Sequence, residues 1–210
     1  ETPADKVTVY VTISNDGVPI RGKDGTILCH KAITVPYFDL SRYDMPEFYR
    51  FHTANGEGEY VDENIVERPT GLHLYLYLLE RYFIGLPEDE CGKGKYTRSD
   101  LEGFILRDDV LYMDEDPAYT ADTLAALKIT GSPTSLYMAN FWGHDENLMY
   151  YRNHCYPYMS PGWGSTSDYI LLSNGDTWDV AMYSNWSFWS SGGAFTCFDK
   201  DEYLSLIHIS

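Results

Sequence analysis

The 210-residue sequence has little positive charge and no long uninterrupted run of apolar residues. Only 15 lysines and arginines stand against 32 aspartates and glutamates, which gives a formal net charge of −17. A surface of this sign repels phosphate backbones and anionic lipid headgroups, so binding to nucleic acid or to anionic membranes is disfavoured. The longest apolar strings are interrupted by Arg, Glu or Gly, so we expect no membrane insertion.

Cysteine is also scarce. Cys29, Cys91, Cys155 and Cys197 show neither a C-x-x-C pair nor a zinc-binding spacing. Four cysteines allow three full pairings, and the sequence does not choose among them. We expect buried thiols or at most one bridge, because a chain of this length with many aromatic rings needs no disulfide frame.

The sequence lacks the motifs of common catalytic and phosphate-binding sites. In Gly162–Thr166 the serine follows the second glycine, so the string is not the G-x-S-x-G elbow of hydrolases. Gly92–Lys95 has neither the preceding strand nor the Ser or Thr of a phosphate loop. His154 and Cys155, as neighbours on a strand, would point to opposite faces and form no nucleophile–base pair.

Two polar clusters raise the hypothesis of a metal site, but their spacing does not support it. His144-Asp145-Glu146 does not match H-E-x-x-H, and we interpret it, with nearby His154, as a polar turn. The carboxylates of Asp114–Asp116 and Asp122 lack the D-x-D-x-D-G loop of calcium sites and indicate an exposed acidic loop. We therefore expect no metal, no cofactor and no catalytic residue.

Aromatic residues, by contrast, make up 16% of the chain, which is too many for a disordered protein. The clearest predicted strand is Lys6–Ser14, in which apolar side chains alternate with Thr8, Tyr10 and Thr12. After two turns and an edge segment, Val18–Ile20, the chain is predicted to return as a second strand over Thr26–Val35. Together the two strands predict an opening hairpin.

The main helix is predicted over Pro69–Gly85, or about residues 69–84. Leucine at alternate positions also fits a strand, but the run is too long for one and contains a stripe with a period of 3.6 residues. Pro69 suits a first helical turn, and Gly85 suits a C-terminal stop. His73 is interpreted as a hydrogen-bonded residue at the edge of the core. The stripe consists of Leu72, Tyr75, Leu76, Leu79, Tyr82 and Phe83.

The segments on either side of this helix are predicted to be less regular. Pro36–Val66 is expected to be a long loop packed on the core by its rings. Residues 86–131 are expected to form a partly helical insertion. Its helices are predicted at Asp100–Arg107, behind a capping box at Ser99–Glu102, and at Thr120–Leu127.

Residues 135–184 are predicted to form short strands, with a final strand at Ala194–Phe198. In Thr177–Tyr183, Trp178 faces one way and Asp179 the other, which is the pattern of a half-buried strand. Asn174-Gly175 suits a tight turn that needs a positive φ. The other predicted strands are Ser135–Trp142, Leu148–Tyr151 and Tyr169–Leu172.

Three strings in this region carry a resemblance to a known family. They are Tyr150-Tyr151-x-Asn153, then Pro161–Thr166, then Asp168–Leu172 followed by x-x-Gly175-Asp176. This pattern, over roughly residues 134–190, resembles an uncharacterised extracellular domain of Gram-positive bacterial surface proteins. That domain is in turn similar to the C-terminal β-grasp-like domain of transcobalamin and intrinsic factor.

The resemblance implies an α+β fold in which a β-grasp-like mixed sheet packs on the main helix. It also implies a secreted or cell-surface location, in the Gram-positive cell wall. We expect a single domain over residues 1–203 and a non-native tail at 204–210. The first residues are expected to be a linker or a processed N-terminus, and the natural protein to continue into other domains.

The expected function is a non-enzymatic module that binds a surface glycan, a peptide or a small molecule through an aromatic-rich surface. The candidate ligand-binding residues are Trp142, Tyr151, Asn153 and Trp163, of which Trp163 is the one most readily placed in an exposed loop. One alternative is an accessory carbohydrate-binding module or a glycan-processing enzyme, which would need two carboxylates across an aromatic cleft. Another is a structural spacer in a surface array.

Overall fold

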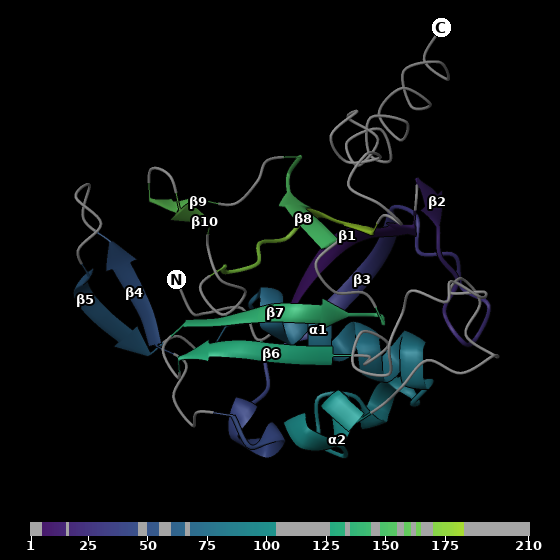
Figure 1. Cartoon of the computed structure of the whole chain (residues 1–210), viewed down its shortest axis with the longest axis horizontal. Helices are drawn as coiled ribbons and strands as arrows, with labels where there is room; N and C mark the ends of the chain where they lie inside the picture. The colour runs from purple at the N-terminus through teal and green to yellow at the C-terminus, as the bar shows by residue number, and fades with distance from the viewer. Residues whose placement is uncertain are drawn as a thin grey trace, which may run out of the picture.

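The computed structural model describes residues 6–15, 17–45, 50–54, 60–65, 68–103, 127–132, 135–143, 148–154, 158–160, 163–164 and 170–182. They form a mixed sheet of five strands, three two-stranded sheets and a few helices, so the predicted α+β class is confirmed (Figure 1). None of the helices in these ranges is both long and apolar enough to cross a membrane. The predicted acidic loop, final strand and tail lie outside the described residues.

The main sheet is formed by β1 (Lys6–Asn15), β2 (Val18–Pro19), β3 (Lys31–Pro36), β8 (Leu148–Arg152) and β11 (Thr177–Met182). β1 is antiparallel to β3 and parallel to β11, and β11 is antiparallel to β8. β2 pairs with the end of β1. The first and last of these strands in the chain therefore lie side by side at the centre of the sheet.

The opening hairpin is confirmed, although its second strand begins later than predicted. β3 starts at Lys31, whereas Thr26–Val35 was the expected range. Before β3, Ile27 forms only an isolated bridge with Arg21. His30 has a φ of 45°, a left-handed conformation that interrupts an extended strand.

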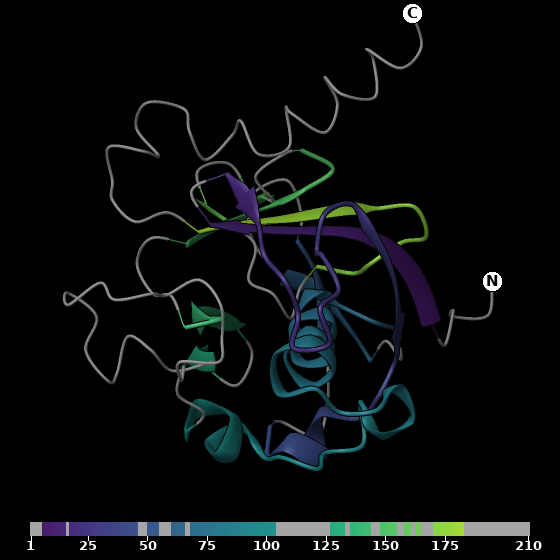
Figure 2. The same cartoon turned by 90° about the vertical axis from the view of Figure 1, so that its right-hand side faces the viewer.

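The predicted main helix is confirmed as α1 (Gly71–Leu78), which continues as the π-helix η2 (Leu79–Ile84). Its N-cap is Thr70 rather than Pro69, and Gly85 ends it with a φ of 88°. Every residue of α1 is buried, so the predicted stripe is only part of a helix that is covered on all sides. Figure 2 shows the sheet on one side of α1 and the 3-10 helix η1 (Leu40–Tyr43) on the other.

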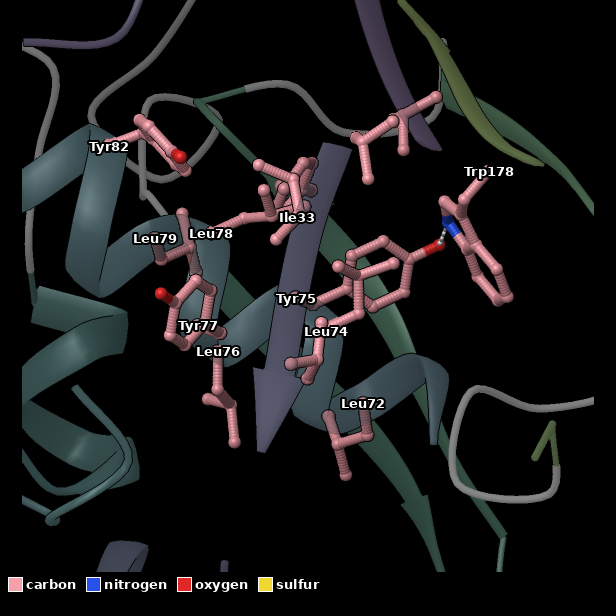
Figure 3. Packing of buried hydrophobic residues seen from close by; sticks show 14 of the residues in the cluster. Ile33, Leu72, Leu74, Tyr75, Leu76, Tyr77, Leu78, Leu79, Tyr82 and Trp178 are labelled. Atoms are coloured by element: carbon pink, nitrogen blue, oxygen red, sulfur yellow. Dashed lines mark hydrogen bonds between the residues drawn. The ribbon is translucent and has the colours of Figure 1, made fainter. Parts of the chain in front are cut away.

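Aromatic rings fill the space between α1 and the sheet. The Tyr75 ring lies edge-on to Trp178, with 5.7 Å between centroids. Trp178 Nε1 donates a 3.1 Å hydrogen bond to the Tyr75 hydroxyl, so the two polar atoms satisfy each other inside the core (Figure 3). The leucines of α1 and the valines and isoleucines of β1 and β3 complete this core.

Several other predictions need correction. Pro36–Val66 is not one irregular loop, because it contains η1 and an antiparallel pair, β4 (Arg50–Ala54) with β5 (Tyr60–Ile65). β7 (Ser135–Phe141) pairs with β6 (Leu127–Ser132) and stays outside the main sheet. Leu127 is therefore in a strand, not in the helix predicted to end there.

Three more elements of two or three residues lie in the described ranges. The 3-10 helix η3 spans Glu88–Glu90, and β9 (Tyr158–Ser160) pairs with β10 (Trp163–Gly164). In place of the strand predicted over Tyr169–Leu172, Leu171 makes an isolated bridge with Thr70.

The short helix α2 spans Arg98–Gly103, close to the helix predicted at Asp100–Arg107. Its capping box differs from the predicted one. The Asp100 carboxylate accepts from Thr97 N at 2.9 Å, and the Asp100 N–H donates to Thr97 Oγ1 at 3.2 Å. The box is thus formed by Thr97 and Asp100, two residues earlier than Ser99–Glu102.

Candidate functional site

The side of the main sheet that faces away from α1, here called the outer face, carries mostly polar residues. Side chains alternate along each strand, so when Val11 and Trp178 face α1 their neighbours face outward. The outer face has an exposed part over β3 and the first half of β1, and a buried part over β11 and β8. By register, its described residues are Lys6, Thr8, Tyr10, Thr12, Ser14, Ala32, Thr34, Pro36, Met149, Tyr151, Thr177, Asp179 and Ala181.

In the exposed part, the rings of Tyr10 and His30 stack on each other. Their centroids are 4.8 Å apart and their planes differ by 12°. Tyr10 is 36% exposed, and His30 is exposed as well. Two residues before Tyr10, the hydroxyls of Thr8 and Thr34 share a 2.9 Å hydrogen bond across the two strands. The four residues form a small surface patch, here called the ring patch.

The backbone holds His30 in position over Tyr10. His30 N donates a 2.9 Å hydrogen bond to the Thr12 hydroxyl, which stabilises the left-handed conformation at His30. Ala32 lies directly across from Tyr10 in the β1–β3 register, and its methyl group takes little room beside the tyrosine ring. The backbone bond at His30 and the small Ala32 side chain therefore position the two rings without a ligand.

The buried part of the outer face contains a carboxylate. Asp179 is 3% exposed, and its Oδ2 lies 3.6 Å from Nδ1 of His154. This distance is longer than a hydrogen bond, so the contact is electrostatic and needs a protonated imidazole to become an ion pair. The sequence predicted a half-buried strand here, and this is wrong: β11 is buried on both faces.

Asn153 and Asp176, two of the residues that carry the family resemblance, form hydrogen bonds at the turn before β11. The Asp176 carboxylate accepts hydrogen bonds from Arg152 Nε at 2.9 Å, Asn153 Nδ2 at 3.0 Å and Ser173 N at 2.9 Å. Asn153 also exchanges two bonds with the backbone of Thr177, both of 2.9 Å. These bonds fasten the end of β8 to the start of β11.

The same turn is also bonded to β1. Gly175, with a φ of 86°, donates from its N–H to Thr8 O at 2.9 Å. Thr8 N in turn donates to Asn174 Oδ1 at 2.8 Å, and Tyr10 N donates to Asp176 O at 2.8 Å. The predicted Asn174-Gly175 turn is confirmed, and it sets the parallel register between β1 and β11.

The structure does not bring the predicted ligand-binding residues together at a surface. Trp142 is fully buried and packs edge-on against Phe83, with 5.2 Å between ring centroids, and Tyr151 is only 2% exposed. Trp142 belongs to the core, and Tyr151 is buried on the outer face, so neither ring is available at a surface. Asn153 is exposed, but its side chain is already bonded to the turn. Trp163 lies in β10, and its side chain is outside the described residues.

Sequence reasoning missed the ring patch. The alternation in β1 showed that Tyr10 faces away from the apolar side, which is a usable signal. No signal in the sequence placed His30 beside it, because this depends on the left-handed backbone at His30 and on the β1–β3 register.

Two other ionisable groups are buried in the core and act structurally. Burial lowers the pKa of His73 to about 4, so the ring is neutral. Its Nδ1 accepts from Thr70 N and Oγ1, at 3.2 and 2.8 Å, and Nε2 donates to Phe38 O at 2.9 Å. The interpretation of His73 as a hydrogen-bonded residue is confirmed, although it lies inside the core rather than at its edge.

Glu80, in the first turn of η2, connects three segments from within the core. Tyr43 donates its hydroxyl to Glu80 Oε1 and Oε2, each at 3.0 Å, and Gly92 N donates to Oε2 at 2.8 Å. Burial raises the pKa of Glu80, and these two donors oppose that shift. The carboxylate is fully buried, so it stabilises the loop around Gly92 rather than meeting a substrate.

Within the described ranges, no group of three or more His, Cys, Asp or Glu side chains could hold a metal ion. The cluster His144-Asp145-Glu146 lies outside those ranges. Comparisons with protein-family models, with curated proteins and with solved structures found no match to this chain.

Proposed function

We propose that this chain is a non-enzymatic binding module with a β-grasp-like fold, and that the outer face of its sheet binds a ligand or partner. The strand order β3–β1–β11–β8 supports the fold assignment, because two antiparallel pairs flank a central parallel pair. α1 and η2 follow the first pair in the chain and pack on the sheet. The insertion predicted at residues 86–131 falls between this helix and the second pair in the chain.

The turn before β11 supports the kinship on which this proposal draws. Asn153, Gly175 and Asp176 belong to the strings that resemble the extracellular domain of Gram-positive bacteria and the transcobalamin-like β-grasp domain. Their hydrogen bonds join β1, β8 and β11 in this chain. The proposed location, secreted or in the Gram-positive cell wall, rests on that resemblance and on the acidic composition.

The ring patch is the observation that carries the binding role. Most described rings in this protein are buried, whereas Tyr10 and His30 are stacked and exposed on a rigid sheet. An aromatic surface on a rigid element offers a large contact area at a low cost in conformational entropy. The proposed surface therefore differs from the one predicted around Trp142 and Trp163.

A binding screen on the whole chain tests this proposal. Its probes are N-acetylchitohexaose, a random-sequence peptide library and cobalamin, with binding measured by calorimetry and probe integrity by chromatography. We expect saturable binding of one class, with every probe recovered intact. Cleavage of a probe, or no binding in any class, would overturn the proposed function.

An enzyme is the second candidate, and the pair Asp179–His154 is the observation that favours it. A buried carboxylate beside a histidine that is 35% exposed would orient that histidine as a general base once the 3.6 Å contact shortens to a hydrogen bond. If the screen detects turnover, His154→Ala should abolish it, while Asp89→Asn, at an exposed residue outside both proposed sites, should leave it unchanged. Turnover that survives His154→Ala would remove this candidate.

A further inference from the structure

We propose that the ring patch binds an uncharged pyranose oligosaccharide, with one sugar ring stacked on the Tyr10–His30 pair. This inference rests on the proposed function and adds the ligand class and the contact residues. It differs from the prediction made from the sequence, which placed an aromatic site at Trp142, Tyr151, Asn153 and Trp163.

The geometry of the two rings favours a flat apolar partner. Because they stack at 4.8 Å with planes 12° apart, one face of each ring is used within the pair. The pair is nevertheless exposed, so part of its ring surface remains in contact with water. The apolar C–H face of a pyranose ring is flat and rigid, and covering an aromatic ring with it removes apolar area from water on both sides.

The neighbours of the rings can serve the hydroxyl groups of a sugar. Thr8 and Thr34 are hydrogen-bonded to each other, and each hydroxyl oxygen keeps at least one lone pair that can accept from a sugar O–H. Asn174 is exposed and bonded to Thr8 N through Oδ1, and no partner of its NH₂ group is found in the described part of the chain. Thr8 and Thr34 form the pair next to Tyr10 and Ala32 on the same face, and Asn174 is bonded to Thr8, so one oligosaccharide that covers the rings would extend over these groups.

The distribution of charge favours an uncharged ligand. The chain carries a net charge of −17, yet the described exposed residues of the outer face include no carboxylate. The outward row of β1 and β3 contains one lysine, Lys6, at its end. A polyanion would be repelled by the rest of the surface, and a cation would find no acidic partner at the rings. A neutral polyhydroxylated ligand meets neither obstacle.

The strained backbone at His30 indicates that the site is preorganised. A non-glycine residue with a φ of 45° is uncommon, and the bond from His30 N to Thr12 Oγ1 keeps it there. With His30 held in place, binding would not have to order the histidine first, which lowers the entropic cost of association.

Calorimetric titration of the whole chain with N-acetylchitohexaose and cellohexaose tests the inference. Tyr10→Thr removes a ring but suits an exposed strand, and His30→Asn removes the other ring but tolerates the left-handed conformation. Each should weaken binding about tenfold or more. Tyr10→Phe keeps the ring and should bind like the wild type. Ile27→Thr, at an exposed apolar residue outside the ring patch, is the matched control.

The outcomes separate this inference from the proposed function. If the hexasaccharides bind and both ring-removing variants lose that binding, the inference holds. If only a peptide or cobalamin binds, or if the sugars bind equally well to Tyr10→Thr and His30→Asn, the sugar site is wrong while the binding module stands. If no probe binds, both the sugar site and the proposed binding function are wrong. Circular dichroism of each variant excludes loss of folding as the cause.

Discussion

The two faces of the main sheet use aromatic rings in opposite ways. On the side of α1, Trp178 contacts Tyr75 and stacks on Tyr150, and the first two of these rings are fully buried. On the outer face, Tyr10 stacks on His30 and both remain exposed. The high aromatic content of the chain therefore mainly reflects its core, and a ligand surface has to be sought by position rather than by composition.

The largest effect that would test this contrast is the loss of Trp178. Trp178→Ala removes a fully buried ring and leaves the Tyr75 hydroxyl without its donor, so we expect a loss of about 3–5 kcal/mol in the free energy of unfolding. Tyr10→Thr, on the outer face of the neighbouring strand, should change it by less than about 0.5 kcal/mol. Urea unfolding measures both. Similar losses for the two variants would contradict the distinction between the faces.

The core side should also make the protein sensitive to acid through His73. The pKa of this residue is lowered to about 4 by burial, below the ordinary value of 6.5. A lowered pKa means that the unfolded chain binds the proton more tightly, so stability is full above pH 6.5 and falls as the pH drops toward 4. The expected loss is about 3 kcal/mol.

His73→Gln removes this titration, so its free energy of unfolding should vary less between pH 6.5 and 4 than that of the wild type. The variant will be less stable than the wild type at neutral pH, because the bonds to Thr70 and Phe38 are altered. Identical pH dependence in the two proteins would show that His73 is not buried in neutral form.

The turn before β11 joins β1, β8 and β11, the three strands that carry most of both faces. Asp176→Ala leaves Arg152 Nε, Asn153 Nδ2 and Ser173 N without their acceptor, and should cost about 2–3 kcal/mol. Asp89→Asn, at an exposed residue, is the control and should cost almost nothing. A loss below 0.5 kcal/mol for Asp176→Ala, in urea unfolding, would mean that the turn does not hold the strands.

The smallest expected effect concerns Glu80. Because its pKa is raised by burial, the folded state binds the proton more tightly, and the stability gained from the protonated form is lost as the pH rises through that pKa. Glu80→Gln keeps an acceptor for Tyr43 or Gly92 and avoids the buried charge. At pH 7 it should match or exceed the wild type in stability, by up to about 1 kcal/mol.

Glu88→Gln removes one negative charge at an exposed residue and is the matched control for Glu80→Gln. Denaturant unfolding at pH 5 and pH 8 is the measurement. A strong destabilisation by Glu80→Gln at pH 8, with no change for Glu88→Gln, would contradict the expectation that the negative charge of Glu80 adds no net stability.

Local patterns in the sequence predicted the elements that depend on nearby residues. The alternation in Lys6–Ser14, the long leucine and tyrosine run at Leu72–Leu79 and the Asn174-Gly175 pair each specify local geometry, and all three predictions were confirmed. The parallel pairing of β1 with β11 could not be predicted in the same way, because it joins residues from the two ends of the described chain.

Most of the candidate site could not be predicted from the sequence either, because it also depends on contacts between residues that are distant in the chain. Trp142 was a fair surface candidate by composition, but packing against Phe83 and Phe141 decides its burial, and sequence patterns do not show such contacts. His30 could not be identified from the sequence, because its position over Tyr10 depends on its left-handed backbone, with a φ of 45°. Tyr10 was predictable as an outward residue and not as half of a stacked pair.

The central claim is that ligand binds on the outer face while the side of α1 remains closed core. Backbone amide chemical shifts of the isotope-labelled whole chain, followed during titration with N-acetylchitohexaose, test it most directly. Perturbations that cluster at Thr8, Tyr10, His30 and Thr34, with α1 unchanged, are the predicted result. Perturbations centred on α1, or none at saturating sugar, would contradict it.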